Sequence, residues 1–466
     1  MRQSSVWPNS LWLEGRPIDR HPVVSPGERA DVLIVGAGFT GLWTALHLRR
    51  LAPALSIMVV DAEQPGFGAS GRNGGWCSAF APMSLDGLAQ SASSGAAVAF
   101  QRALIDTVSE IGDFTTAHGI DCGWTHAGTL SLARTGPQVN RLRANINEAR
   151  RHGFGDEFLR MLRPDEVDER VRVPGVRCAT HSPACATVDP LALALGIAAV
   201  ARESGVAVRG DSRFISHRGE SGSNVVRLAV AGDEIETECD WLLLCTEGFT
   251  ARLAGHRRRI APLYSYMVAT EPLPDSVWQR IGWDSRETIA DARRLVIYAQ
   301  RTRDGRIAFG GRGAPYRWAS RIDPKHDTDP GVHDRIVSTM FEMFPEARGA
   351  DVTHRWGGAL GVTRDWHTTA RVDRTKRTGF AGGYVGDGVA LSHLAAAGLA
   401  RAVLGIDDEI AGLPFVGHRG PDWEPEPLRW LGINGMLRAV ALADRLEART
   451  DRPARRLGAL IDRLTG

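Results

Sequence analysis

The chain has 466 residues, 43% of them hydrophobic and 24% charged, which is typical of a globular protein with more than one domain. Its formal net charge of +2 is too balanced to indicate a nucleic-acid or anionic-membrane partner. The six cysteines are scattered without a C-x-x-C pair, which predicts reduced thiols, a cytoplasmic location and no metal site. No secretory signal or long apolar run is evident, so no membrane span is expected.

The first strong motif lies in the segment DVLIVGAGFTGLWTALHLRR, which begins at residue 31. Residues 32–35 are all apolar and predict a parallel strand that is buried on both faces. The glycines Gly36, Gly38 and Gly41 then form G-x-G-x-x-G, and apolar residues follow at helical spacing. In this context the glycines permit a tight turn, close approach of a pyrophosphate and close packing of the helix on the strand.

The second strand, LSIMVVDAE, ends at Asp61, about 20 residues after the last glycine of the motif. An acidic side chain at this place accepts the hydroxyl groups of an adenosine ribose and disfavours a 2′-phosphate. The order of strand, glycine turn, helix, strand and acid therefore predicts dinucleotide binding. The alternative is a set of turn glycines and an aspartate that only caps a loop.

The stretch GFGASGRNGG, residues 66–75, favours FAD over NAD as the dinucleotide. Its small residues allow backbone to lie against a flat ring system, where N–H groups face the polar ring edges. Arg72 places positive charge near a pyrophosphate or a reduced ring, and the amide of Asn73 both donates and accepts hydrogen bonds.

These motifs together resemble the FAD-dependent D-amino-acid oxidase superfamily, which includes glycine and sarcosine oxidases, and in particular bacterial γ-glutamylputrescine-oxidase-like members. The resemblance extends to TEGF at 246–249, to RIAFGGRGAPY from residue 306 and to GGYVGDGVALSHLAAAGLA from residue 382. It implies an α/β fold (α+β overall). In such a fold a Rossmann-like FAD-binding domain is combined with a discontinuous, mainly antiparallel-sheet substrate domain.

The expected domains are discontinuous in the sequence. Residues 1–95, 180–260 and 350–420 are expected to form the FAD-binding domain, and residues 96–179 and 261–349 the substrate domain. Residues 421–466 are predicted to form a helical tail packed on the body of the protein. The sequence leaves the oligomeric state open.

FAD is expected to bind non-covalently, because no cysteine follows Cys245 and the loop at 66–75 contains no histidine for a flavin linkage. The residues that motif and resemblance together assign to the cofactor are Gly36, Gly38, Phe39, Thr40, Gly41, Asp61, Ala62, Ser70, Gly71, Arg72, Asn73, Gly74, Gly75, Val208, Thr246, Glu247, Gly248, Gly386, Asp387, Gly388 and Val389.

All five tyrosines lie between residues 264 and 384, near several tryptophans, which predicts an aromatic-lined pocket. We expect Tyr298 to reflect strand propensity alone. Arg312, between glycines, is a candidate to pair with a substrate carboxylate. The pocket and catalytic candidates are Arg312, Tyr264, Tyr266, Trp366 and His393.

The resemblance implies oxidation of an amine or amino acid, with hydride transfer from the carbon next to nitrogen to flavin N5. Imine hydrolysis and reoxidation by O2 to give H2O2 would follow, so the partners are a small amine substrate and O2. One alternative is an amine dehydrogenase that passes electrons to a quinone or protein. Two others are a flavin monooxygenase, because VGDG at 385–388 is similar to a monooxygenase segment, and a flavin-holding protein without catalysis.

Overall fold

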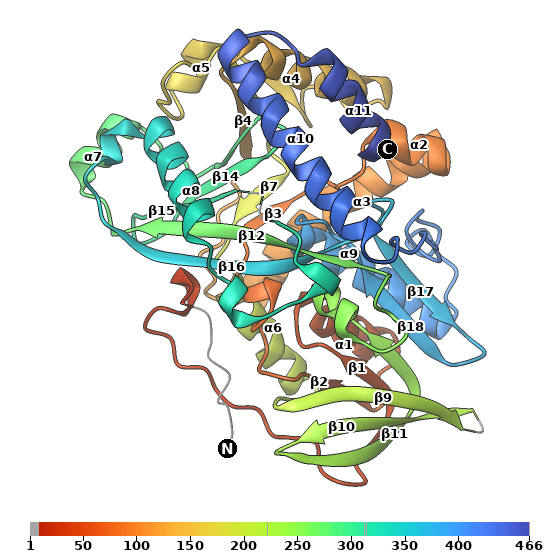
Figure 1. The fold of residues 1–466 in the computed structure, drawn as a ribbon. Helices are drawn as coiled ribbons and strands as arrows, with labels where there is room; N and C mark the ends of the chain where they lie inside the picture. Colours follow the sequence, from red (N-terminus) through yellow and green to blue (C-terminus); the bar gives the residue numbers. More distant parts are fainter. Residues whose placement is uncertain (1–8, 221, 312, 314, 466) are drawn as a thin grey trace.

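The computed structural model describes residues 9–220, 222–311, 313 and 315–465 of the chain. Two large mixed sheets form the body of the molecule, one in the lower and one in the upper half of Figure 1. The predicted fold class, a Rossmann-like domain combined with a mainly antiparallel second sheet, is confirmed by these two sheets.

The first sheet contains the strand that precedes the G-x-G-x-x-G turn. Its neighbours in order are β17 (Thr369–Asp373), β18 (Thr378–Gly382), β11 (Asp233–Leu244), β1 (Arg29–Val35), β2 (Ile57–Val60) and β8 (Ala207–Arg209). The strands from β18 to β8 are parallel, whereas β17 is antiparallel to β18. An antiparallel extension of β11 is formed by β10 (Ser223–Val230) and β9 (Ser212–Glu220).

The side chains of β1 explain why this strand is apolar throughout. Val32 and Ile34 lie in one hydrophobic cluster, and Leu33 and Val35 lie in another. Successive side chains of a strand point to opposite faces, so both faces of β1 are covered.

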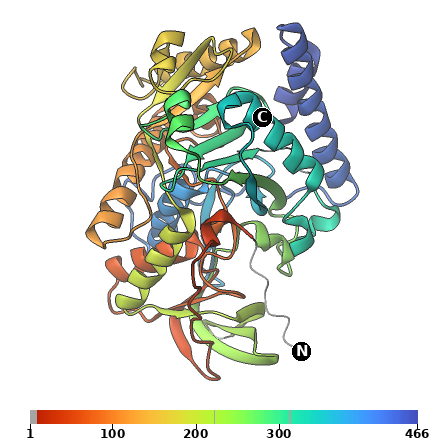
Figure 2. The same ribbon diagram turned by 90° about the vertical axis from the view of Figure 1, so that its left-hand side faces the viewer.

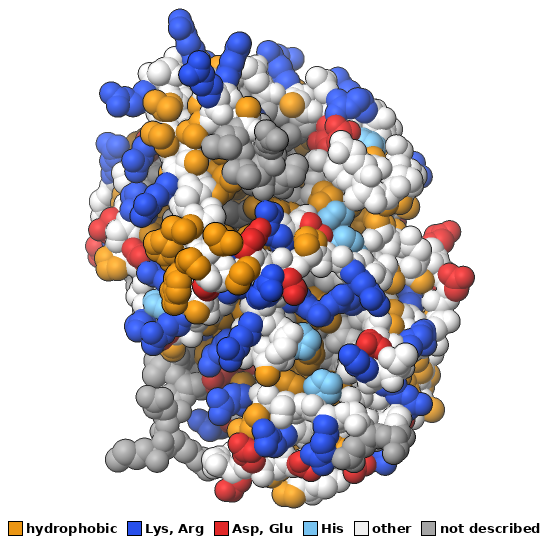
Figure 3. Space-filling view, turned by 45° about the vertical axis from the view of Figure 1, so that its right-hand side comes forward, with side chains coloured by type: hydrophobic (Ala, Val, Ile, Leu, Met, Phe, Trp, Pro, Cys, Tyr) orange, Lys and Arg blue, Asp and Glu red, His pale blue; other side chains and the backbone are white. Residues whose placement is uncertain are grey.

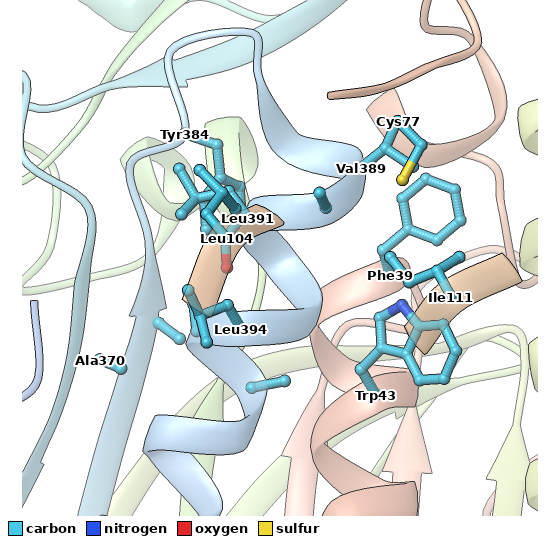
Figure 4. Packing of buried hydrophobic residues seen from close by; sticks show 14 of the residues in the cluster. Phe39, Trp43, Cys77, Leu104, Ile111, Ala370, Tyr384, Val389, Leu391 and Leu394 are labelled. Carbon is cyan, nitrogen blue, oxygen red and sulfur yellow. The ribbon is translucent and has the colours of Figure 1, made fainter. Parts of the chain in front are cut away.

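Helices α1 (Phe39–Leu51), α3 (Ser94–Ala117) and α9 (Gly388–Leu404) pack together in the larger of these clusters, which also contains α6 (Pro190–Glu203). Figure 4 shows side chains of all three helices meeting, among them Trp43, Leu104 and Leu394. We expected α3 in the substrate domain, but its buried face packs with the core of the first sheet. The domain boundaries remain a proposal.

The second sheet has the order β16 (Val352–Val362), β12 (Ala261–Thr270), β15 (Ile307–Gly311), β14 (Ile297–Arg301), β13 (Thr288–Asp291), β4 (Thr129–Ala133), β6 (Cys178–Ser182) and β5 (Arg160–Leu162). All its neighbours are antiparallel except β13 and β4. A separate antiparallel pair is formed by β3 (Trp76–Ser78) and β7 (Cys185–Thr187).

The remaining helices lie on the outside of the molecule, as the two views show (Figures 1 and 2). They are α2 (Leu85–Ser91), α4 (Gly136–Arg151), α5 (Pro164–Asp168), α7 (Asp275–Ile281), α8 (Pro330–Met343), α10 (Leu428–Thr450) and α11 (Arg455–Thr465). Within the described residues, no helix is both long enough and apolar enough to cross a membrane.

The tail helix α10 is attached to the second sheet by its inner face. Ile433 packs in a cluster with Tyr316 and Val362. The Asn434 amide accepts a hydrogen bond from the backbone N–H of Tyr316 at 3.0 Å and donates one to its carbonyl at 3.1 Å. Two hydrogen bonds to the backbone of Tyr316 hold α10 at a defined position against the loop that follows β15.

An ion pair connects the glycine-rich loop at 66–75 to the segment that precedes α8. Arg72 Nη1 lies 2.8 Å from Asp327 Oδ2, and the two side chains are only 6% and 16% exposed. Arg72 Nε also donates to the carbonyl of Phe67 at 2.7 Å. Burial raises the pKa of Asp327, and the guanidinium of Arg72 opposes this rise. The pair is therefore a buried link between the two halves of the molecule.

We predict that Gly41→Ala severely destabilises the protein. An added Cβ would lie 1.9 Å from the carbonyl oxygen of Gly36 and 3.3 Å from the Ile34 side chain, so backbone must move. We expect a loss of at least about 3 kcal/mol, measured by urea unfolding. Gly432→Ala, in α10 with no atom within 4 Å of the new Cβ, should be neutral or stabilising by up to about 1 kcal/mol. Equal effects of the two substitutions would contradict the close approach.

We predict that Asp327→Asn lowers the free energy of unfolding by about 3–5 kcal/mol, because it leaves Arg72 buried without its counter-charge. The matched control is Asp121→Asn, which breaks the ion pair with Arg303, also 2.8 Å long but 78% and 70% exposed. This exposed pair should contribute less than about 1 kcal/mol. Urea unfolding of both variants measures the difference, and a loss no larger than that of the control would refute the structural role of the buried pair.

Candidate functional site

The turn after β1 contains positions that only glycine can occupy. Gly36 has a φ of +110°, and an added Cβ would lie 2.4 Å from the carbonyl oxygen of Cys245, which directly follows the neighbouring strand β11. Gly38 is partly exposed and is the N-cap residue of α1. It therefore leaves the backbone of the turn open to a ligand.

The N-cap residue of α1 is Gly38, which has no side chain, and the first turn contains no acidic residue; within the described chain only the Phe39 N–H has a side-chain acceptor, Ser70 Oγ from the glycine-rich loop. By contrast, an N-cap side chain accepts a hydrogen bond from the first turn in α2, α3, α4, α6 and α8. An N-terminus without a side-chain cap keeps N–H groups and the positive end of the helix dipole available to an anion. The site at α1 therefore fits a phosphate group.

Asp61 ties the end of β2 to this turn. Its Oδ2 accepts a hydrogen bond from the Ala37 N–H at 2.7 Å, and its Oδ1 accepts one from the Glu63 N–H at 2.9 Å. Asp61 is only partly exposed, and the burial of its carboxylate raises its pKa to about 6. Each carboxylate oxygen has a second lone pair, so Asp61 retains acceptor capacity for a ligand.

The loop at 66–75 folds back over the start of α1. Ser70 Oγ accepts a hydrogen bond from the Phe39 N–H at 2.9 Å and lies 2.9 Å from a Cβ built on Gly38. Asn73 donates to the carbonyls of Ala69 and Ser70, and its own Oδ1 accepts from the Gly75 N–H at 2.8 Å. The amide of Asn73 therefore shapes the loop itself.

The last two glycines of the loop contact the second sheet directly. A Cβ on Gly74 would lie 2.7 Å from the ring of Tyr298, and a Cβ on Gly75 would lie 2.1 Å from Gln300 Nε2. Gln300 donates to the Gly74 carbonyl at 2.7 Å and to the Val188 carbonyl at 3.3 Å. Any larger residue at 74 or 75 would separate the loop from β14.

The Glu247 carboxylate accepts hydrogen bonds from three backbone N–H groups, one in β16 and two in the turn that follows β18. It accepts from Gly361 in β16 at 3.2 Å, and from Gly383 at 2.9 Å and Tyr384 at 3.3 Å. Burial raises its pKa to about 7, although these hydrogen bonds favour the ionised form. Tyr384 in turn shares a hydrogen bond of 2.9 Å with Thr40 of α1. Glu247 therefore positions the turn that leads into α9.

The start of α9 and its neighbours complete the predicted cofactor set. Gly386 has a φ of +107°, and Asp387 and Gly388 are partly exposed where the helix begins. The first turn of α9 contains no acidic residue. Its N-terminal dipole therefore offers a second positive site for polar groups of a ligand.

The other predicted cofactor residues lie around the same edge of the first sheet. Val208 pairs with Val59 in the parallel ladder of β2 and β8, and Ala62 is exposed directly after Asp61. Thr246 Oγ1 shares a hydrogen bond of 2.8 Å with Thr250, and a Cβ on Gly248 would lie 3.2 Å from the Ala359 carbonyl oxygen. Gly71 is buried in the glycine-rich loop, and Val389 is buried in the first turn of α9.

The carboxyl ends of β1, β2 and β11 thus carry the structural features that a bound dinucleotide needs. The carboxylate of Asp61, the N-terminus of α1 and a loop of bare backbone converge there from distant parts of the sequence. Ligands of open α/β sheets bind at the carboxyl ends of the strands. The residues present therefore fit FAD.

The predicted catalytic candidates that lie within the described residues occupy three separate places. Tyr264 and Tyr266 are buried on the face of β12 that packs against α8, and Tyr266 donates to the His326 carbonyl at 2.8 Å. Arg312 lies outside the described residues. Trp366, with a φ of +60°, packs in the cluster that contains Tyr316.

His393 lies in a third place, between α1, α3 and α9. Its ring is 4.6 Å from that of Trp43 and 4.7 Å from that of His47, centroid to centroid. Its Nδ1 is 3.7 Å from Glu110 Oε2, and burial lowers its pKa to about 3. His393 is therefore a neutral core residue on the side of α9 that faces α1.

The opposite face of β12 presents different side chains. Ser265 Oγ and Tyr298 OH share a hydrogen bond of 2.7 Å, and both residues are partly exposed. The ring of Tyr298 lies over Gly74 and forms an edge contact with Trp76 at 6.2 Å. The period-two alternation of LYSYMVAT indicates that Ser265 points away from both flanking tyrosines, but not which face meets the loop.

Comparison with known proteins identifies the family. The family model for FAD-dependent oxidoreductases of the DAO type matches residues 31–402. The probable oxidoreductase OrdL of Rhizobium meliloti is 26% identical over 415 residues, which cover 88% of this chain and 91% of the relative. The gamma-glutamylputrescine oxidoreductase of Escherichia coli is 25% identical over 390 residues, covering 82% and 86%.

The fold is also that of a known enzyme structure. The crystal structure of glycine oxidase from Geobacillus kaustophilus superposes with a TM-score of 0.70, covering 84% of this chain and 99% of that one at 18% identity. The family match spans most of the chain and includes every element that carries the cofactor features. The chain therefore belongs to the DAO family and is an FAD-dependent oxidoreductase.

Proposed function

We propose that this protein binds FAD non-covalently and oxidises the carbon next to nitrogen in a small amine or amino acid. The observation that carries the proposal is the pair Ser265 and Tyr298. The two residues are partly exposed, and the ring of Tyr298 lies against Gly74 of the glycine-rich loop. The names of two relatives support the substrate class, since one is a gamma-glutamylputrescine oxidoreductase and another a glycine oxidase.

Bound FAD supplies a two-electron acceptor for the carbon–hydrogen bond that is broken. The residues of this chain hold and orient the partners. Asp61 would accept the adenosine ribose hydroxyls, and the N-terminus of α1 would bind the pyrophosphate. The first turn of α9 would stabilise negative charge that develops on the ring during reduction.

The Ser265–Tyr298 pair is proposed to position the substrate nitrogen. Ser265 Oγ also donates to the Gly311 carbonyl at 3.4 Å, and its oxygen is the proposed acceptor for an amine N–H. The edge contact of Trp76 with Tyr298 adds apolar surface that excludes water and favours the neutral amine. Tyr264 and Tyr266 would support the sheet from its other face, and Arg312 stays a sequence-based proposal for binding a substrate carboxylate.

The electron acceptor after substrate oxidation is proposed to be O2, with H2O2 as the product. The alternative is a dehydrogenase that uses a quinone or protein acceptor. Stopped-flow reoxidation by air distinguishes the two, because the reduced flavin of an oxidase disappears rapidly in air-saturated buffer.

We predict that FAD binding weakens as the pH falls through about 6. The pKa of Asp61 is raised to about 6, so the carboxylate is ionised above this pH and protonated below it. A protonated carboxyl loses one acceptor for the ribose, and the fraction ionised changes about tenfold between pH 7 and pH 5. The dissociation constant of FAD, measured by fluorescence titration of the apoprotein, should increase by a similar factor. In Asp61→Asn the binding should be weaker at pH 7 and lose this dependence; an unchanged pH profile in the variant would refute the assignment.

We predict that Tyr298→Phe lowers kcat/KM for the preferred amine by about tenfold or more, because one hydrogen bond to the substrate is lost or misaligned. A panel of amines and amino acids, scored by H2O2 release and by anaerobic bleaching of the flavin band, first identifies that substrate. FAD content should not change in the variant.

The matched control is Tyr264→Phe, which removes a hydroxyl on the buried face of the same sheet, where its contacts to Asp323 are 3.4 and 3.5 Å long. It should retain activity. If Tyr264→Phe lost activity while Tyr298→Phe stayed fully active, the substrate would bind at the Tyr264 face of the sheet and not at the Tyr298 face. Absence of bleaching with every amine would refute the proposed reaction.

A further inference from the structure

Helix α10 has an outer face that no other part of the described chain covers. Four of its leucines are exposed to an unusual degree, with exposed fractions of 60% for Leu428, 56% for Leu431, 50% for Leu442 and 42% for Leu446. Their successive spacings are three, eleven and four residues, which places them on one side of a helix. Exposed apolar residues gathered on one side of a helix indicate an interaction site.

The apolar stripe continues beyond the helix. Trp318, which is 55% exposed, lies beside Trp430 of α10 with a centroid distance of 6.4 Å. Both tryptophans are at the end of the helix that carries Leu428 and Leu431. Tryptophan combines an apolar ring with a polar N–H group and is enriched at membrane–water interfaces.

Arginines occupy the remaining positions of the same stripe. Arg438, Arg445 and Arg449 are exposed, and none of them forms an ion pair within the described part of the chain. Three more exposed arginines, Arg452, Arg455 and Arg456, follow where α10 ends and α11 begins. Figure 3 shows hydrophobic side chains among basic ones on this side of the molecule.

The acidic side chains of α10 point inward and are neutralised there. Asp444 accepts hydrogen bonds from the backbone N–H groups of Arg294 at 3.0 Å and Leu295 at 2.9 Å. Glu447 is buried and pairs with Arg141 at 2.8 Å. The α10 face, defined as Leu428, Leu431, Arg438, Leu442, Arg445, Leu446 and Arg449, is therefore apolar and positive without a compensating acid.

We propose that the α10 face docks on an anionic lipid surface, with α10 parallel to the membrane plane. Helices that combine exposed leucine and tryptophan with arginine bind at the headgroup region, where apolar burial and attraction to anionic lipids act together. The inner face of α10 is already held by the second sheet, so binding needs no unfolding. The helix lies beyond the residues 31–402 that the family model matches.

A second copy of the chain is a poorer occupant of this face. A parallel pairing of two α10 helices would place each arginine of the stripe against its own copy. An antiparallel pairing centred on Arg438 would bring the two Arg438 side chains together. Like charges at such positions destabilise a helix pair, whereas an anionic surface is attracted by all of them.

The proposal is tested by flotation of the full-length, FAD-loaded protein with lipid vesicles. Vesicles of phosphatidylcholine with about 30% phosphatidylglycerol should bind the protein, and pure phosphatidylcholine vesicles should not. Binding should weaken as salt is added, because exposed charges are screened. Leu442→Glu/Leu446→Glu and Arg438→Glu/Arg445→Glu should each reduce the bound fraction at least about tenfold.

Matched controls place the same changes elsewhere on the surface. Val23→Glu changes another exposed apolar residue, and Arg213→Glu reverses an exposed charge on β9, far from α10 in Figure 1. Both should bind vesicles as the wild type does, and all variants should keep their FAD absorbance and thermal midpoint.

Wild-type protein that does not float with anionic vesicles, or double variants that float as well as the controls, would overturn the proposal. A dimer in sedimentation that Leu442→Glu/Leu446→Glu dissolves, without vesicle binding, would assign the face to a second copy instead. The test does not use the substrate, so its outcome is independent of the proposed reaction.

Discussion

The structure depends on the close approach of bare backbone between the two large sheets. At Gly74 and Gly75 the loop lies so near Tyr298 and Gln300 that a single Cβ would not fit. The buried pair of Arg72 and Asp327 closes the same junction with opposite charges, and Asn73 gives the loop its shape. Because the loop contacts both large sheets, a change in the loop alters the packing of both halves of the molecule together.

The second recurring device is a carboxylate that organises backbone N–H groups. Asp61 holds the first glycine turn to the end of β2, and Glu247 holds the turn before α9 to β16. Burial raises the pKa of both carboxyl groups because it penalises the ionised form. The two N–H donors to Asp61 and the three to Glu247 oppose this rise but do not cancel it. Such carboxylates shape a ligand site before the ligand arrives, and this limits the rearrangement that binding requires.

The tail illustrates how an average conceals a local property. A formal net charge of +2 over 466 residues indicates no particular partner. The fold, however, turns Asp444 and Glu447 inward and leaves arginines and leucines on the outer side of α10. If the α10 face binds lipid, the enzyme would work beside a membrane, where apolar electron acceptors are also found. Lipid binding by the α10 face would then bring the reduced flavin close to such electron acceptors.

The sequence by itself determined the elements whose signal is local. The all-apolar run at 32–35, the spacing of Gly36, Gly38 and Gly41, and the acid at the end of the next strand each depend on near neighbours, and together they predicted the FAD-binding fold. Only the tertiary structure decided which face of β12 meets the glycine-rich loop. Tyr264 and Ser265 are adjacent in the chain, yet they point to opposite sides of the sheet, and the packing of α8 on one side determines which is buried. The partners of Arg72 and Glu247 are likewise remote in sequence, because long-range contacts carry no periodic signature.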